Sequence, residues 1–214
     1  MKGKVALAVG LICAGGLVLT ACSNTSATEP AVIEQKIIEQ KSVEAPVRDP
    51  AMQQLVDQAG LNPCPVGVEN PDAAIPGLPN IELPCLGDGP PVNLSTLRGI
   101  PLVVNVWASW CPPCIEEMPI LAQAARELEG TVQFIGIDYQ DDPARGLELL
   151  TDMGVDFPSV FDPDAQVRAP LAIPGPPVTY FVTPEGVIAG RWDGSITSEQ
   201  ALATLIETYL GVTW

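Results

Sequence analysis

Residues 100–119 read IPLVVNVWASWCPPCIEEMP, and this stretch decides the fold. Its nearly continuous apolar run, residues 102–107, predicts a strand that is covered on both faces. A helix is predicted to follow from residue 112 to about residue 128, because Pro112 and Pro113 suit a first turn, where no backbone N–H is needed. The stretch therefore predicts a strand, a short turn with a cysteine, and a helix.

The two cysteines of this stretch, Cys111 and Cys114, are spaced for redox chemistry. Cys111 is expected at the helix start, where unpaired backbone N–H groups and the helix dipole favour a thiolate, the nucleophilic form of cysteine. Cys114 lies one turn further on, from where its thiol can attack a mixed disulfide on Cys111. The pattern predicts a redox-active dithiol; a metal clip and a plain structural disulfide are the alternatives for the same spacing.

Hydrophobic periodicity and turn residues predict further elements on both sides of this stretch. Strands are expected at residues 132–137, near 158–161, at 178–182 and at 187–192, with a hairpin around 81–86 and 92–94. Helices are expected at residues 51–59, 142–154 and 198–210, with a weak one around 165–169. This order implies an α/β sandwich with a central mixed β-sheet.

The N-terminus has the pattern of an export signal. Lys2 and Lys4 precede an apolar run at residues 5–21 that is short for a transmembrane helix, which is the alternative. Residues 19–22, LTAC, resemble the lipobox of bacterial lipoproteins. By that resemblance the chain is cut before Cys22 and Cys22 is acylated, and several acyl chains give stable anchoring to a membrane.

Composition divides the remainder of the chain. We predict a lipoprotein signal peptide at residues 1–21, a flexible acidic tether at 22–50, an N-terminal extension at 51–91 and the α/β domain at 92–214. The extension carries Cys64 and Cys85, which we expect to form a structural disulfide because exported proteins sit where disulfides persist. A zinc site made of these and the Cys111 pair is disfavoured by spacing, and no metal or cofactor is expected.

Charge and composition exclude several kinds of function. The 214 residues carry a formal net charge of −16 and no basic stretch, which argues against nucleic-acid binding. No histidine is present, so imidazole general bases, Cys-His and Ser-His nucleophile pairs and histidine metal ligands are all excluded.

The stretch from Asn105 through Cys111 and Cys114 to Pro119 resembles the thioredoxin superfamily, and specifically its membrane-anchored TlpA/ResA/DsbE-like branch. The resemblance implies a thioredoxin-like three-layer sandwich, with the extra α-β insertion of TlpA-type proteins between residues 142 and 161. It extends to residues 175–181, GPPVTYF, which are similar to the family's cis-proline strand start.

The resemblance also implies roles for individual residues. Cys111 is expected to be the attacking thiol, Cys114 the resolving thiol, and Pro177 the cis-proline that faces them. Asn105 stands where thioredoxin has a buried Asp, and Asn is usual in the TlpA-like branch. Glu117, three residues after Cys114, is the substitute candidate for proton exchange with the thiols; the alternative is a solvated acid on the helix surface.

Contacts with substrate are predicted for three residues, Trp110, Pro176 and the cis-proline candidate Pro177. Trp110, adjacent to Cys111, is expected to cover the rim of the site. Pro176 removes a backbone N–H at a position where thioredoxin-like proteins often pair with substrate backbone, so we expect weaker or differently registered peptide docking.

These observations predict an extracytoplasmic thiol-disulfide oxidoreductase, lipid-anchored at the outer face of a bacterial cell membrane. Its partners are expected to be exported protein thiols and disulfides and an upstream redox partner, such as a membrane electron donor. Reduction of exported thiols, as in cytochrome c maturation, is the leading hypothesis. The alternatives are an oxidase in disulfide formation, a peroxiredoxin-type peroxidase and a non-catalytic lipoprotein.

Overall fold

The structure, a computed structural model, describes residues 48–68 and 77–214. The predicted signal peptide at residues 1–21, the acylation of Cys22 and nearly all of the predicted tether therefore lie outside the described residues. Within the described ranges, no helix combines the length and the apolar composition needed to cross a bilayer.

A five-stranded mixed sheet forms the centre of the domain, in the order β5-β4-β3-β6-β7. Its strands are β3 (Leu102–Trp107), β4 (Gln133–Tyr139), β5 (Ser159–Asp162), β6 (Val178–Val182) and β7 (Ile188–Asp193). β3, β4 and β5 run parallel to one another, and β6 is antiparallel to both β3 and β7. Every residue of β3 is buried, as its continuous apolar sequence predicted.

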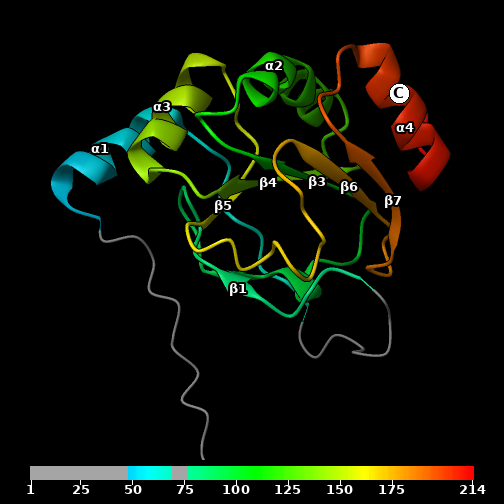
Figure 1. Cartoon of the computed structure of the whole chain (residues 1–214), viewed down its shortest axis with the longest axis horizontal. Coiled ribbons are helices and arrows are strands. Elements are labelled where there is room, and N and C mark those ends of the chain that lie inside the picture. Colours follow the sequence, from blue (N-terminus) through cyan, green and yellow to red (C-terminus); the bar gives the residue numbers. More distant parts are fainter. Residues whose placement is uncertain (1–47, 69–76) are drawn as a thin grey trace, which may run out of the picture. The chain divides into compact units, whose positions relative to one another are not determined.

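Four helices pack on one face of this sheet, as Figure 1 shows for α2, α3 and α4. They are α1 (Pro50–Ala59), α2 (Pro112–Glu127), α3 (Pro143–Asp152) and α4 (Glu199–Leu210), and α1, α2 and α3 carry Pro in the first turn. Asp49, Asp142 and Ser198 cap α1, α3 and α4 by accepting hydrogen bonds from backbone N–H groups of the first turn. α3 and β5 occupy the predicted α-β insertion.

The other face of the sheet is covered by segments without α-helix. These are the antiparallel pair β1 (Glu82–Leu83) and β2 (Val92–Asn93), the single 3-10 turn η1 (Leu94–Thr96), and the loop at residues 163–177. The predicted weak helix at 165–169 is wrong, because residues 166–172 form a run of hydrogen-bonded turns and no α-helix. Ala165 has a left-handed φ of 55°, and Pro170 has no N–H to continue a helix. The predicted α/β sandwich with a central mixed sheet is confirmed.

The N-terminal extension closes the β5 edge of the sheet. Cys85 pairs with Val160 as an isolated antiparallel bridge, the Leu86 N–H donates to the Ser159 carbonyl at 2.8 Å, and the Phe161 N–H donates to the Pro84 carbonyl at 2.9 Å. The unpaired groups of an edge strand are thereby partly satisfied by the chain itself.

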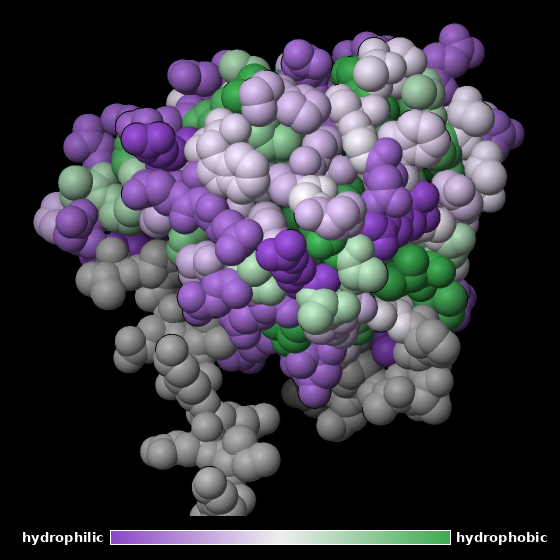
Figure 2. Space-filling view, in the orientation of Figure 1, coloured by the Kyte–Doolittle hydropathy of each residue, from purple (hydrophilic) through white to green (hydrophobic). Residues whose placement is uncertain are grey.

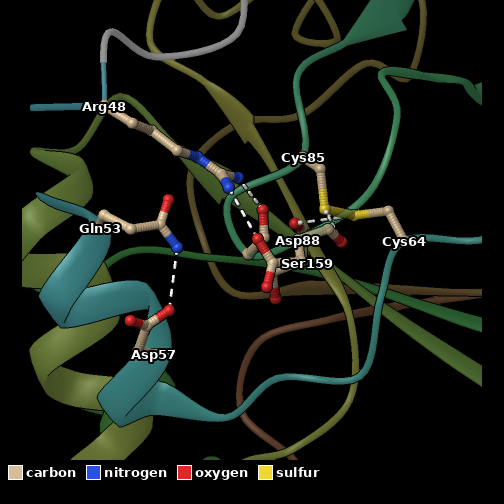
Figure 3. Close-up of polar contacts among 8 residues, drawn as sticks. Arg48, Gln53, Asp57, Cys64, Cys85, Asp88 and Ser159 are labelled. Carbon is tan, nitrogen blue, oxygen red and sulfur yellow. Dashed lines mark hydrogen bonds and ion pairs between the residues drawn. A yellow bond between two sulfur atoms is a disulfide. The ribbon is translucent and has the colours of Figure 1, made fainter.

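A disulfide between Cys64 and Cys85 holds the extension in this place, with the two Cα atoms 6.0 Å apart. Figure 3 shows the surrounding contacts: the Cys64 sulfur lies 3.4 Å from the Ser159 carbonyl oxygen, and Arg48 forms a 2.8 Å ion pair with Asp88. Both cysteines are buried, so this disulfide is part of the packed structure. The surface over α1 and α3 is mainly hydrophilic (Figure 2).

Candidate active site

The end of β3 presents a dithiol pair at the start of α2. Cys111 is the N-cap residue of α2 and Cys114 lies in its first turn; the two sulfurs are bonded, with the Cα atoms 5.3 Å apart. The turn between β3 and α2 is closed by the Cys111 N–H, which donates to the Ala108 carbonyl at 3.2 Å. Strand, turn and helix lie where the sequence predicted them.

The surroundings of the two sulfurs are unequal. Cys111 is 3% exposed, whereas Cys114 is completely buried, so Cys111 is the more accessible of the two cysteines. The backbone N–H of Cys114 points at the Cys111 sulfur, at 3.3 Å. This N–H also donates to the Cys111 carbonyl at 3.0 Å, and at the helix start it favours, together with the helix dipole, negative charge on the Cys111 sulfur.

Glu117 lies one turn after Cys114 on the same helix and is completely buried. Its Oε1 accepts a 2.9 Å hydrogen bond from the side-chain amide of Asn105 on β3, and its Oε2 accepts a 2.8 Å hydrogen bond from the Ile196 N–H. Burial raises the pKa of Glu117 to about 7, although the hydrogen bonds from Ile196 and Asn105 pull it down. A buried carboxyl that titrates near neutral pH is able to exchange a proton with a neighbouring thiol.

Asn105 links Glu117 to a polar side chain on the neighbouring strand. Its amide also donates to Thr179 Oγ1 at 3.1 Å, and Thr179 is its cross-strand partner on β6. Within the described part of the chain, the amide oxygen of Asn105 has no hydrogen-bond partner. The sequence indicated that Asn105 replaces an acid, but nothing near Asn105 in the sequence indicated that its amide orients Glu117.

The Pro176–Pro177 peptide bond is cis and precedes β6 directly. Because Val178 pairs with Val106 in the antiparallel register, Pro177 lies at the same end of the sheet as the turn before Cys111. Pro177 is buried and its carbonyl accepts a 3.0 Å hydrogen bond from the Gly194 N–H, while Pro176 is half-buried.

Trp110 is the exposed side chain beside Cys111. It is 53% exposed, and its indole N–H donates to the Gln140 carbonyl at 3.0 Å. The preceding residue, Ser109, is bonded to the Asp141 carboxylate through both its backbone N–H and its hydroxyl. The turn that leads into Cys111 is therefore tied to the segment after β4.

A second buried carboxyl, Asp138, was not found by sequence analysis. It is the cross-strand partner of Trp107 on β4, it is completely buried, and neither of its oxygens has a hydrogen-bond partner among the described residues. Burial, followed by the nearby negative charges of Asp141 and Asp142, raises its pKa well above the usual range. The only signal in the sequence was an acid at the end of an apolar strand.

Comparisons with known proteins agree with this architecture. Residues 77–191 match the model of the AhpC/TSA family. The chain is 34% identical to "Thiol:disulfide interchange protein DsbE" of Vibrio cholerae serotype O1 over 116 residues, which cover 54% of this chain and 61% of that protein. It is also 34% identical to the protein of that name from Haemophilus influenzae, covering 52% of this chain and 61% of that one. The matched part thus spans less than two thirds of these relatives.

Among solved structures, the structure of MTB dsbF in mixed oxidised and reduced forms matches with a TM-score of 0.57 and 27% identity. That match covers 64% of this chain and 99% of the other, so the predicted thioredoxin-like fold is confirmed. Because the family match takes in more than half of the chain and the whole Cys111 region, this chain belongs to the AhpC/TSA family.

Proposed function

We propose that this protein is a thiol-disulfide oxidoreductase that works outside the cytoplasm and keeps thiols of exported proteins reduced, as in cytochrome c maturation. The observation that carries the proposal is the Cys111–Cys114 disulfide at the start of α2, in which Cys111 is the slightly more exposed cysteine, with Glu117 buried one turn after Cys114. Similarity to proteins named thiol:disulfide interchange protein supports the same chemistry.

The first step uses Cys111. Its thiolate attacks one sulfur of a substrate disulfide, forms a mixed disulfide, and releases the other substrate sulfur as a thiolate that takes up a proton. The N–H of Cys114 at 3.3 Å stabilises the Cys111 thiolate before the attack.

The second step uses Cys114 and Glu117. Cys114 gives its proton to the Glu117 carboxylate, and its sulfur attacks the Cys111 sulfur of the mixed disulfide. The substrate leaves with its second thiol, two electrons have passed to it, and the protein carries the Cys111–Cys114 disulfide. An upstream dithiol partner must then reduce this disulfide to restore the starting state.

A peroxidase of the peroxiredoxin type would need a separate peroxidatic thiol. The four cysteines in the described part of the chain form the Cys64–Cys85 and Cys111–Cys114 disulfides. Their arrangement therefore favours dithiol exchange.

The location rests on the N-terminal sequence. We propose that Cys22 is acylated and anchors the domain to the outer face of the cell membrane, with residues 23–50 as a tether. Full-length protein should then fractionate with membranes and carry the acyl mass on Cys22, whereas a Cys22→Ala variant should lose both. A wild-type protein without the added mass would contradict the anchor and leave the redox proposal untouched.

The redox proposal is tested by reducing the purified protein and titrating it with glutathione. We expect one reversible two-electron transition, lost in Cys111→Ala, and a trapped mixed disulfide with substrate in Cys114→Ala. A potential near −270 mV, which is about that of thioredoxin, supports a reductase, and one near about −120 mV would replace it by an oxidase. Wild-type exchange rates in Cys111→Ala would overturn the proposal.

A further inference from the structure

The turn before Cys111 is held from outside by the segment that follows β4. The Asp141 carboxylate accepts the Ser109 N–H on Oδ2 and the Ser109 hydroxyl on Oδ1, the latter at 2.8 Å. Ser109 is two residues before Cys111 in the sequence, while Asp141 is 32 residues after Ser109. Hydrogen bonds to an ionised acceptor are stronger than those between neutral groups, so this is a firm attachment.

The next residue of the turn is held by the same segment. The indole N–H of Trp110 donates to the Gln140 carbonyl at 3.0 Å, and Gln140 has a left-handed φ of 49°. A side chain such as Gln rarely adopts this conformation, and such residues persist where surrounding structure enforces them, often at functional sites. The Gln140 N–H is fixed in turn by the Asp162 carbonyl at 2.9 Å.

The holding segment has its own anchors. Asp142 caps α3 by accepting from the N–H groups of Ala144 and Arg145, and its own N–H donates to Asp141 Oδ1 at 2.8 Å. Residues 140–142 are thus placed by α3 and β5 without help from the cysteine turn. The hydrogen bonds from Ser109 to Asp141 and from Trp110 to Gln140 then fix the two residues directly before Cys111.

The chemistry of a dithiol depends on such placement. Closing the disulfide requires the Cys111 and Cys114 sulfurs to meet, and the equilibrium reflects how often the free thiols are in position to do so. Cys114 is fixed within α2, but Cys111 is the cap residue and its backbone is extended, with φ −100° and ψ 100°. The preceding turn therefore decides where Cys111 lies when the disulfide is open.

We propose that Asp141 is a positioning residue for the dithiol, which acts through Ser109 to hold Cys111 within reach of Cys114. The proposal rests on the proposed thiol-disulfide function and adds a residue to it. Asp141 acts by placing the turn and does not touch the reacting sulfurs.

The experiment is a glutathione titration of the purified protein, in which two reduced thiols and one glutathione disulfide become the Cys111–Cys114 disulfide and two reduced glutathiones. Asp141→Ala removes both contacts to Ser109, and we expect the equilibrium constant for closing the disulfide to fall about tenfold. For this two-electron couple, tenfold equals a potential about 30 mV more positive.

Matched variants separate placement from charge. Asp141→Asn removes the charge and can still accept the Ser109 N–H and donate to the Ser109 hydroxyl, but its amide nitrogen cannot accept the Asp142 N–H. Its equilibrium constant should therefore lie nearer to that of the wild type than to that of Asp141→Ala. Glu116→Gln removes an equal charge from an exposed position at the start of α2 and should also change little. Ser109→Ala keeps the backbone contact alone and should lie between, and Ser109→Thr should restore the wild-type constant. If Asp141→Ala does not fold, the comparison of Ser109→Ala with Ser109→Thr still tests the proposal.

The outcomes are distinct. An equal shift in Asp141→Asn and Asp141→Ala would show that charge and not placement is at work, and would overturn the proposal. Unchanged constants in Asp141→Ala and Ser109→Ala would overturn it as well. A wild-type protein without a reversible transition would instead overturn the proposed function itself.

Discussion

The side-chain amide of Asn105 donates a 2.9 Å hydrogen bond to Oε1 of Glu117, and both residues are buried. β3 supplies the amide and α2 supplies the acid, so the contact ties the central strand to the helix that carries both cysteines. Because Oε2 is held by the Ile196 N–H, the Glu117 carboxyl has a fixed orientation. A fixed carboxyl with a pKa of about 7 is suited to proton exchange, and its replacement has measurable consequences.

The first prediction concerns the rate of the second step. Replacing Glu117 by Gln removes the proton acceptor for Cys114, so we expect release of substrate from the mixed disulfide to slow by about 10- to 100-fold at pH 7. The wild-type rate should rise through about pH 7 as Glu117 ionises, and the variant should lack this rise. Stopped-flow measurement of single-turnover release between pH 5 and 9 provides the test. Glu116→Gln serves as control, and an unchanged pH profile in Glu117→Gln contradicts the role.

The second prediction concerns stability. In the unfolded chain Glu117 loses its proton near pH 4.5, whereas the folded protein keeps it until about pH 7. The folded state therefore binds the extra proton in this interval, and its stability falls as pH rises through it, by about 3 kcal/mol in total. Glu117→Gln should lack this loss because Gln does not ionise. Its buried contacts can persist, since Gln can accept from the Ile196 N–H and donate to the oxygen of a rotated Asn105 amide. Urea unfolding of the oxidised proteins at pH 5 and pH 8 measures the difference, and parallel pH curves for variant and wild type would rule the linkage out.

The third prediction concerns Asp138. Its raised pKa means that the folded state holds a proton that the unfolded chain has released, so this carboxyl lowers stability as pH rises above the ordinary range for Asp. Asp138→Asn cannot ionise, so the difference between its free energy of unfolding and that of the wild type should grow as the pH rises above the ordinary range for Asp. Asp152→Asn, at an exposed position at the end of α3, is the control and should follow wild type. A constant gap between Asp138→Asn and wild type would show that Asp138 is already charged when folded.

The sequence alone predicted the elements well, because their signals are local. The apolar run of β3, the prolines that open α2 and α3, and the capping Asp142 and Ser198 all act within one turn of the element they define. The failed helix at 165–169 has a local pattern that tertiary context overrides: Asp162 accepts the N–H groups of Gln166 and Val167, which favours a turn.

The site was only partly predictable, because some of its contacts join residues that are far apart in the sequence. Cys111 and Cys114 are three residues apart at the start of one helix, so their pattern is visible in the sequence. Glu117 was a candidate by its spacing, yet its burial depends on Ile196, which lies 79 residues away. The Ser109–Asp141 contact and the isolation of Asp138 arise from the pairing of β3 with β4 and have no local signature.

The fourth prediction concerns docking of substrate at Pro176. This residue precedes the cis-proline and is half-buried, and it has no N–H to donate to a substrate backbone. Pro176→Thr restores that donor, so we expect KM for a disulfide-containing protein substrate to fall about fivefold, as one added hydrogen bond allows. The rate with a small disulfide that lacks a peptide backbone should not change and is the control. Equal rates for both proteins toward the protein substrate would show that no backbone pairing occurs there.

The fifth prediction separates the two disulfides. Cys64 and Cys85 are 21 residues apart, and in the chain-entropy model closing such a loop stabilises the folded state by about 3 kcal/mol. The Cys64→Ala, Cys85→Ala double variant should lose about that much in urea unfolding, because the extension is then held on β5 by hydrogen bonds and packing alone. Its glutathione titration should match wild type, since this disulfide lies at the β5 edge while Cys111 and Cys114 lie at the start of α2. The Cys111→Ala, Cys114→Ala double variant is the counterpart, without redox exchange and with the Cys64–Cys85 bond intact. If the potential of the dithiol moves when Cys64 and Cys85 are replaced, the extension takes part in the redox chemistry and is not a structural element alone.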